Sequence, residues 1–227
     1  MKKIILSLLI FTNVFAIESD ERKRDYIAKF VPKHMSVKTK KDRFYYLLVP
    51  AIYNVYNELY FKYKSTEYNL FNNVNKKEIA SLKKRYKVNS DEDLLKALKP
   101  HPISITLAQA SMESAWATSR FFVEANNVFG MWSSKRGEKR ISANVKRAGN
   151  RTIWLRKFDT IEDSIRAYYF LLATGKAFKG FCNLKMKTDN PHKLVKKLDK
   201  YSEIGDKYAK ELSGIIRYNK LQKYDIK

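Results

Sequence analysis

The chain has 227 residues, of which 44% are hydrophobic and 14% aromatic, so it can bury a sizeable core and is not intrinsically disordered. Lysine and arginine total 46 against 23 aspartate and glutamate residues, which gives a formal net charge of +23. Such a charge favours polyanionic partners and says little about fold. The single cysteine, Cys182, excludes an intramolecular disulfide, and its apolar and small neighbours predict a buried thiol.

The first 16 residues have the features of a secretory signal peptide. Two lysines precede an apolar run from Ile4 to Phe11, and Val14 and Ala16 stand before the expected cleavage site. The run is too short for a membrane-spanning helix. We therefore expect export to the periplasm or cell envelope and a mature chain with a charge of +21, because two lysines are removed. The alternative is a buried N-terminal core helix.

The first half of the mature chain is predicted to be helical after a charged arm. Residues 17–43 are charged and contain a proline, which favours an extended arm or linker. Apolar and aromatic residues recur at helical spacing over 44–61 and 76–86. A third helix is expected over 90–99, with Ser90 as its N-cap and the following proline as its stop.

The second half combines helices with one small hairpin. Residues 104–116 are neutral and rich in small side chains, which predicts a buried helix. Two β-favouring runs, 141–145 and 152–158, predict an antiparallel hairpin. Three further helices are expected over residues 160–175, 192–198 and 206–218.

Glu113 is an acidic residue within the neutral helix. An apolar environment raises the pKa of a carboxyl group because desolvation disfavours the charged form. A carboxyl that stays protonated near neutral pH can protonate a glycosidic oxygen. Helical geometry places Glu113 to one side of the apolar face, so this pattern alone also allows a surface glutamate at the helix edge.

Two segments resemble the signature of the glucosaminidase family, glycoside hydrolase family 73. Residues 103–116 contain its Ala-Gln-Ala and Glu-Ser elements, and residues 125–130 contain Asn-Asn-Val-Phe-Gly. The similarity extends to about residue 220 and is closest to the Bax-like bacterial proteins. It implies a mainly α fold: a lysozyme-like catalytic domain with a small β-hairpin lobe over 100–227, preceded by an N-terminal arm and helical extension over 17–99.

The resemblance also assigns site residues. Glu113 matches the catalytic acid, and Tyr201 matches a tyrosine near that acid that is important for activity. Five residues are expected at the substrate, with Gly130 allowing close backbone approach and the Trp132 ring stacking on sugar: Asn127, Phe129, Gly130, Trp132 and Tyr168. A core role is the alternative for Tyr201 and Trp132.

The chain departs from the family pattern at the second carboxylate. Between residues 131 and 158 the one acidic residue is Glu138, in a basic turn. We interpret it as a solvated turn residue, with a catalytic base as the alternative. Glycosidases without a second carboxylate can use the substrate's own acetamido group as the nucleophile.

These features predict a peptidoglycan hydrolase that cleaves the β-1,4 bond after N-acetylglucosamine. Glu113 would protonate the leaving oxygen, water would complete the reaction, and no metal or organic cofactor is implied. The expected partner is the peptidoglycan glycan strand, bound by a monomer that is not an integral membrane protein. The alternatives are an inactive wall-binding scaffold of the same fold and a basic DNA-binding protein, which lacks a recognition motif here.

Overall fold

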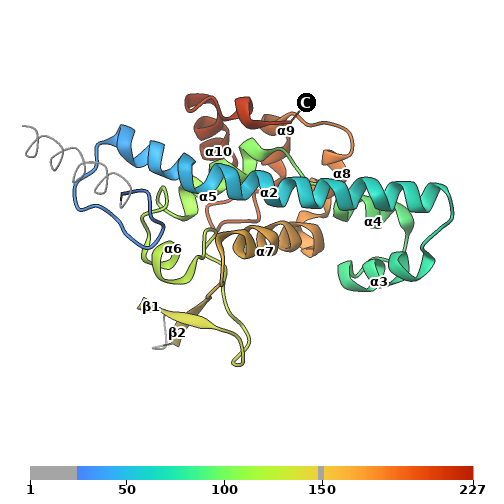
Figure 1. Ribbon diagram of the computed structural model, residues 1–227, viewed down its shortest axis with the longest axis horizontal. Coiled ribbons are helices and arrows are strands. Elements are labelled where there is room, and N and C mark those ends of the chain that lie inside the picture. Colours follow the sequence, from blue (N-terminus) through green and yellow to red (C-terminus); the bar gives the residue numbers. More distant parts are fainter. Residues whose placement is uncertain (1–24, 148–150, 227) are drawn as a thin grey trace, which may run out of the picture.

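The computed structural model describes residues 25–147 and 151–226 (Figure 1). The predicted signal peptide lies outside these residues. Within them the fold is mainly α with one two-stranded antiparallel sheet, which confirms the predicted lysozyme-like architecture. No helix in the described ranges is long and apolar enough to cross a membrane.

The longest element is helix α2, Val37–Phe71, which runs along most of the molecule (Figure 1). It is longer than the predicted 44–61 at both ends, and the prediction of an arm was wrong for residues 37–43. The helix begins there because the Ser36 side chain accepts a hydrogen bond from the Thr39 amide at 3.0 Å. It packs against three later helices, α4 (Asp91–Leu98), α5 (Ile103–Glu113) and α7 (Ile161–Thr174).

Helices α3, Lys76–Tyr86, and α4, Asp91–Leu98, confirm the predictions for this region. The Ser90 side chain accepts from the Asp93 amide at 3.1 Å, as expected of an N-cap. These helices and the C-terminal part of α2 enclose a second, smaller hydrophobic core. The N-terminal extension therefore packs on the rest of the molecule through its own apolar contacts.

Helix α5, Ile103–Glu113, lies at the centre of the main core, and its residues from Ile103 to Ser111 are all buried. Pro102 precedes it and offers no side-chain cap. Asp225, near the C-terminus of the chain, replaces that cap: its carboxylate accepts from the Ser104 amide at 2.7 Å and from the Ser104 hydroxyl at 2.8 Å. The C-terminal tail thus completes the N-terminus of α5.

The predicted helix 104–116 ends three residues early, at Glu113. Ala115, Trp116 and Ala117 have positive φ angles of 52°, 63° and 61°, a left-handed turn. The Ser114 hydroxyl stabilises this turn because it donates to the Ala110 carbonyl and accepts from the Ala117 amide at 2.8 Å. Glu113 is consequently the last helical residue. A short helix that was not predicted follows, α6, Arg120–Ala125.

The predicted hairpin consists of β1, Arg140–Arg147, and β2, Arg151–Arg156, paired so that Ile141 lies opposite Leu155. It extends away from the helical body (Figure 1). Helix α7, Ile161–Thr174, then returns to the main core and confirms the helix expected over residues 160–175.

The C-terminal part contains short helices before a longer one. They are η1, Lys176–Phe178, α8, Lys179–Lys185, α9, Pro191–Leu194, η2, Val195–Lys197, α10, Asp206–Tyr218, and η3, Leu221–Tyr224. Helix α10 confirms the prediction over 206–218, and the one over 192–198 is divided between α9 and η2. Helix α8 and η3 were not predicted. Cys182 on α8 is buried, as predicted.

Arg43 on α2 ties the N-terminal segment to the turn after α5. Its side chain is 1% exposed and donates to four carbonyl oxygens, those of Asp25, Ile27, Phe30 and Ala117, at 2.7 to 2.9 Å. A buried guanidinium satisfied by backbone oxygens holds those segments in one arrangement. The contact to Ala117 reaches the left-handed turn directly after Glu113.

We expect Arg43→Met to lower the free energy of unfolding by about 3 kcal/mol, because it removes the donor shared by these carbonyl oxygens. Urea denaturation measures this change. The matched control is Lys38→Met on the same helix, where the side chain is 88% exposed; it should change the free energy by less than about 0.5 kcal/mol. Equal effects of the two substitutions would contradict an anchoring role for Arg43.

Candidate active site

The carboxyl group of Glu113 lies between α10 and the turn after α6. Tyr208 of α10 donates a hydrogen bond to Glu113 Oε1 at 2.9 Å. The other oxygen, Oε2, faces Gly130: a Cβ atom placed on that glycine would lie 3.8 Å from it. Glu113 is partly buried, so it lies at the boundary between core and surface.

The environment of Glu113 suits a proton donor. Burial raises its pKa above the ordinary value of 4.5, and the Tyr208 hydrogen bond opposes this effect without cancelling it. Desolvation by the apolar end of α5 is therefore the main cause of the shift, as the sequence predicts.

Tyr201 lies beside this pair. Its ring is stacked on that of Tyr208, with centroids 5.6 Å apart and planes 11° from parallel. Burial and the nearby charge of Glu113 both raise the pKa of Tyr201, so its hydroxyl stays protonated. That hydroxyl donates to the Phe129 carbonyl at 3.5 Å, the outer limit of a hydrogen bond. The Tyr201 hydroxyl is thus held only weakly within the protein.

The Asn-Asn-Val-Phe-Gly segment forms the turn that faces Glu113. The Asn127 side chain closes it by accepting from the Met131 amide at 2.9 Å and donating to the carbonyls of Met131 and Arg156. Gly130 has a φ of 62°, which favours glycine. The motif therefore brings backbone close to the acid.

Three of the residues expected at the substrate are buried instead. Asn127, Phe129 and Tyr168 are 1%, 3% and 0% exposed, and the Phe129 ring is stacked on that of Tyr168 with centroids 3.9 Å apart. These side chains support the turn and have no open surface for sugar. Trp132 is different, because 59% of it is exposed and its backbone pairs with Leu155 of the hairpin.

The sequence interpretation missed two residues that contact or support the acid. Tyr208 bonds Glu113 directly, and Gln109 donates to the Tyr208 hydroxyl at 2.9 Å. Gln109 is the glutamine of the Ala-Gln-Ala element and lies four residues before Glu113, hence one turn away on the same helix. This four-residue spacing is the feature of the sequence from which a supporting role of Gln109 could have been predicted.

Glu138 is held in its turn by basic partners. Its carboxylate lies 3.2 Å from the Arg156 guanidinium and accepts from the Lys135 amide at 3.5 Å. Burial alone would raise its pKa, but hydrogen bonds from Ser133 and Lys135 and the charge of Arg156 outweigh burial and lower the pKa. Glu138 therefore has the contacts expected of a turn residue that is paired with its basic neighbours.

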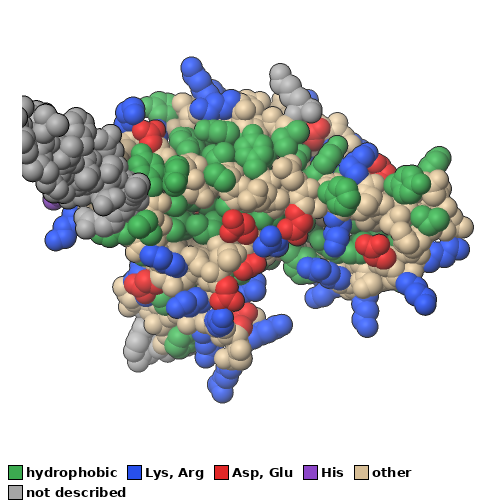
Figure 2. All heavy atoms as spheres, viewed as in Figure 1, with side chains coloured by type: hydrophobic (Ala, Val, Ile, Leu, Met, Phe, Trp, Pro, Cys, Tyr) green, Lys and Arg blue, Asp and Glu red, His purple; other side chains and the backbone are tan. Residues whose placement is uncertain are grey.

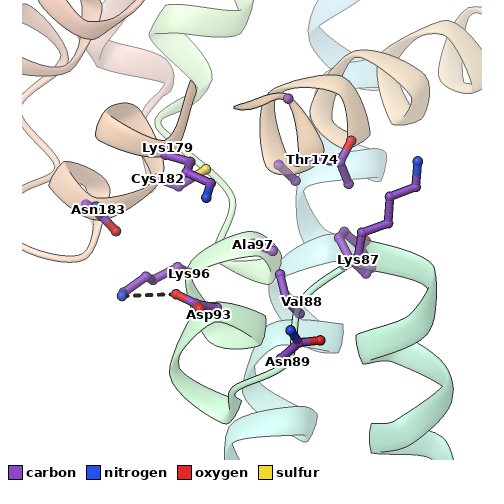
Figure 3. Close-up of a pocket in the computed structure, with 13 residues that line it drawn as sticks. Lys87, Val88, Asn89, Asp93, Lys96, Ala97, Thr174, Lys179, Cys182 and Asn183 are labelled. Carbon is purple, nitrogen blue, oxygen red and sulfur yellow. Dashed lines mark hydrogen bonds and ion pairs between the residues drawn. The ribbon is translucent and has the colours of Figure 1, made fainter. Parts of the chain in front are cut away.

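A separate pocket of about 340 Å³ lies between the α3–α4 connection and the α7–α8 junction (Figure 3). Asp93 supplies the one carboxylate among its lining residues. Hydrogen bonds from Ser90 and then Lys96 lower the pKa of Asp93, so this group stays ionised and cannot act as a general acid near neutral pH. Among the described residues, no group of three or more His, Cys, Asp or Glu side chains could hold a metal ion.

Charged side chains are unevenly distributed over the surface of the molecule (Figure 2). In Figure 2, lysine and arginine side chains project from the hairpin and from the end of the molecule formed by α3, whereas hydrophobic side chains gather along α2. The basic hairpin places positive charge on the same lobe as Trp132. This lobe can attract an anionic polymer.

Comparison with known proteins assigns the chain to a family. Residues 92–221, more than half of the chain, match the sequence profile described as Glucosaminidase: Mannosyl-glycoprotein endo-beta-N-acetylglucosaminidase. The chain belongs to the glucosaminidase family. It is accordingly a glycoside hydrolase. The matched segment of this glucosaminidase begins in α4 and includes Glu113, Gly130 and Tyr201, while α2 and α3 lie outside it.

Solved structures with limited similarity include two wall enzymes. The catalytic domain of the autolysin Auto from Listeria monocytogenes is 17% identical, with 91% of this chain and 97% of that chain covered and a TM-score of 0.48. A peptidoglycan hydrolase from Sphingomonas sp. A1 is 20% identical, with 57% and 86% covered and a TM-score of 0.44. No curated protein sequence matches the glucosaminidase chain. The narrower resemblance to Bax-like proteins stays a prediction.

Glu138 and Tyr201 have different surroundings, so we expect substitutions at these two residues to have unequal effects on the rate of hydrolysis. Glu138→Gln should lower the steady-state rate less than about tenfold, because a carboxylate held by Arg156 in an exposed turn is poorly placed to activate water. Tyr201→Phe should lower it more, because it removes the hydroxyl beside Glu113. If Glu138→Gln abolished turnover and Tyr201→Phe left it intact, the hairpin carboxylate would be the missing base.

Proposed function

We propose that this glucosaminidase cleaves the β-1,4 bond after N-acetylglucosamine in peptidoglycan, with Glu113 as the general acid. The observation that carries the proposal is the position of Glu113 at the end of a buried helix, where burial raises its pKa and Gly130 leaves one carboxyl oxygen approachable. A carboxyl group that keeps its proton at higher pH can protonate the leaving glycosidic oxygen.

The choice of substrate rests on family and charge. The family description names an endo-β-N-acetylglucosaminidase, so the bond on the N-acetylglucosamine side is the one proposed. The peptide stems of peptidoglycan carry carboxylates, and a mature chain with the expected charge of +21 is attracted to them. The predicted signal peptide would place the enzyme in the periplasm or cell envelope, where this polymer lies. We propose that it acts there as a monomer on glycan strands and not on nucleic acid.

The described residues around Glu113 favour a substrate-assisted reaction. Glu138, the acidic residue of the β-lobe, is engaged by Arg156 and has a lowered pKa. We propose that the acetamido oxygen of the N-acetylglucosamine unit attacks its own anomeric carbon while Glu113 gives its proton to the leaving oxygen. Water, deprotonated by the Glu113 carboxylate, then opens the cyclic intermediate and restores the acid.

Other residues of the site have supporting roles in this proposal. The Tyr201 hydroxyl, weakly bonded to Phe129 at 3.5 Å, can turn towards the reacting acetamido group. The Gly130 backbone lies next to the sugar, and the exposed Trp132 ring can stack on a neighbouring unit. The turn over residues 126–130 is supported by the buried side chains of Asn127, Phe129 and Tyr168.

The test is mass spectrometry of purified peptidoglycan digested with the wild-type enzyme and with Glu113→Gln. The wild type should release fragments with reducing-end N-acetylglucosamine. The Glu113→Gln variant should fold and lose at least about 10²-fold in rate, because the substitution keeps the shape and removes the proton donor. Reducing-end muramic acid would assign the other bond, anhydro-muramic products would indicate a lytic transglycosylase, and an absence of products would indicate a wall-binding scaffold. Full activity of a folded Glu113→Gln enzyme would rule out this acid.

A further inference from the structure

A line of buried hydrogen bonds leads from the centre of the core to Glu113. His101 Nε2 lies 3.1 Å from the Tyr168 hydroxyl, and Tyr168 donates to Gln109 Oε1 at 2.5 Å. Gln109 Nε2 donates to the Tyr208 hydroxyl at 2.9 Å, and Tyr208 donates to Glu113 Oε1 at 2.9 Å. We call this series, from His101 to Glu113, the acid-directed chain.

The direction of the acid-directed chain follows from the number of hydrogens available. A tyrosine hydroxyl has one hydrogen. Because Tyr208 accepts from the Gln109 amide, its own hydrogen is left for Glu113. Tyr168 gives its hydrogen to Gln109, so a hydrogen bond between Tyr168 and His101 needs a hydrogen on Nε2, an atom that also lies 3.1 Å from the Thr106 hydroxyl. The three bonds from Tyr168 to Glu113 all point towards Glu113.

The opposite direction would have a different consequence. If the Gln109 amide were rotated by half a turn, its oxygen would accept from Tyr208, and the Glu113 carboxyl would have to donate from Oε1. The proton needed for catalysis would then be directed into the protein. The orientation of one buried amide therefore decides which carboxyl oxygen carries the proton.

We propose that Gln109 is a positioning residue that, through Tyr208, keeps Glu113 Oε1 as a hydrogen-bond acceptor and assigns the transferable proton to Oε2, the oxygen that faces Gly130. This inference rests on the proposed role of Glu113 as acid and adds a residue to it. Gln109 is 0% exposed and touches no substrate. It acts on the acid only through the Tyr208 hydroxyl.

The same arrangement stabilises the carboxylate left after proton transfer. The hydrogen bond from the Tyr208 hydroxyl to Oε1 becomes stronger when Glu113 loses its proton and becomes charged. It also limits the rise in the Glu113 pKa that burial produces, because it favours the charged form. Gln109 thus helps keep the acid strong enough to release its proton.

The experiment is an NMR titration of the Glu113 side-chain carboxyl carbon in ¹³C-labelled full-length protein, with the signal assigned by its loss in Glu113→Gln. Tyr208→Phe should raise the Glu113 pKa by about one unit or more, because it removes a hydrogen bond to a charged group. Gln109→Met, which leaves Tyr208 free to rotate, should raise it by a smaller amount.

The matched control is Tyr63→Phe. Tyr63 is also buried and hydrogen-bonded, to Glu67 at 3.2 Å, but it lies in the second hydrophobic core and has no bond to the acid-directed chain. This substitution should leave the Glu113 pKa unchanged, whatever its effect on stability. The proposal would be overturned by a Glu113 pKa that stays unshifted in Gln109→Met, or by a shift in Tyr63→Phe equal to that in Gln109→Met. These readouts need no turnover, so they remain decisive even if Glu113 proves not to be the catalytic acid.

Discussion

The chemistry proposed for this enzyme depends on the desolvation of the Glu113 carboxyl group at the end of α5. Helix α5 is buried from Ile103 to Ser111, and it ends at Glu113 because Ser114 and a left-handed turn stop it there. If α5 were one turn longer, Glu113 would lie inside the helix and not at its end. The position of Glu113 at the boundary between core and surface therefore depends on the local chemistry of the residues that follow it.

Distant parts of the chain hold that boundary in place. Asp225 completes the N-terminus of α5, and Arg43 holds the turn at its C-terminus through Ala117. Both residues lie outside the segment that matches the family profile, which covers residues 92–221. Helix α2 and the C-terminal tail thus contribute directly to the geometry of α5.

Much of this organisation could be predicted from the sequence, where the determinants are local. Apolar spacing predicts α3, the Ser90 cap predicts α4, and the family motif singles out Glu113 as the candidate acid. The partnership of Glu113 with Tyr208 joins residues 95 positions apart, and neither periodicity nor capping reports such a contact. Burial of Tyr168 and Phe129 was likewise set by tertiary packing. A motif identifies residues that matter without distinguishing those that contact the substrate from those that support it.

The most direct test of this account is the pH dependence of kcat/KM for the wild-type enzyme, which reports the ionisation of the free enzyme. Burial disfavours the charged form of Glu113, so activity should fall as pH rises through a pKa clearly above the ordinary value of 4.5. Activity that instead increased through the ordinary glutamate range and stayed constant at higher pH would show that an ionised carboxylate is required, and would contradict a protonated Glu113 as the acid.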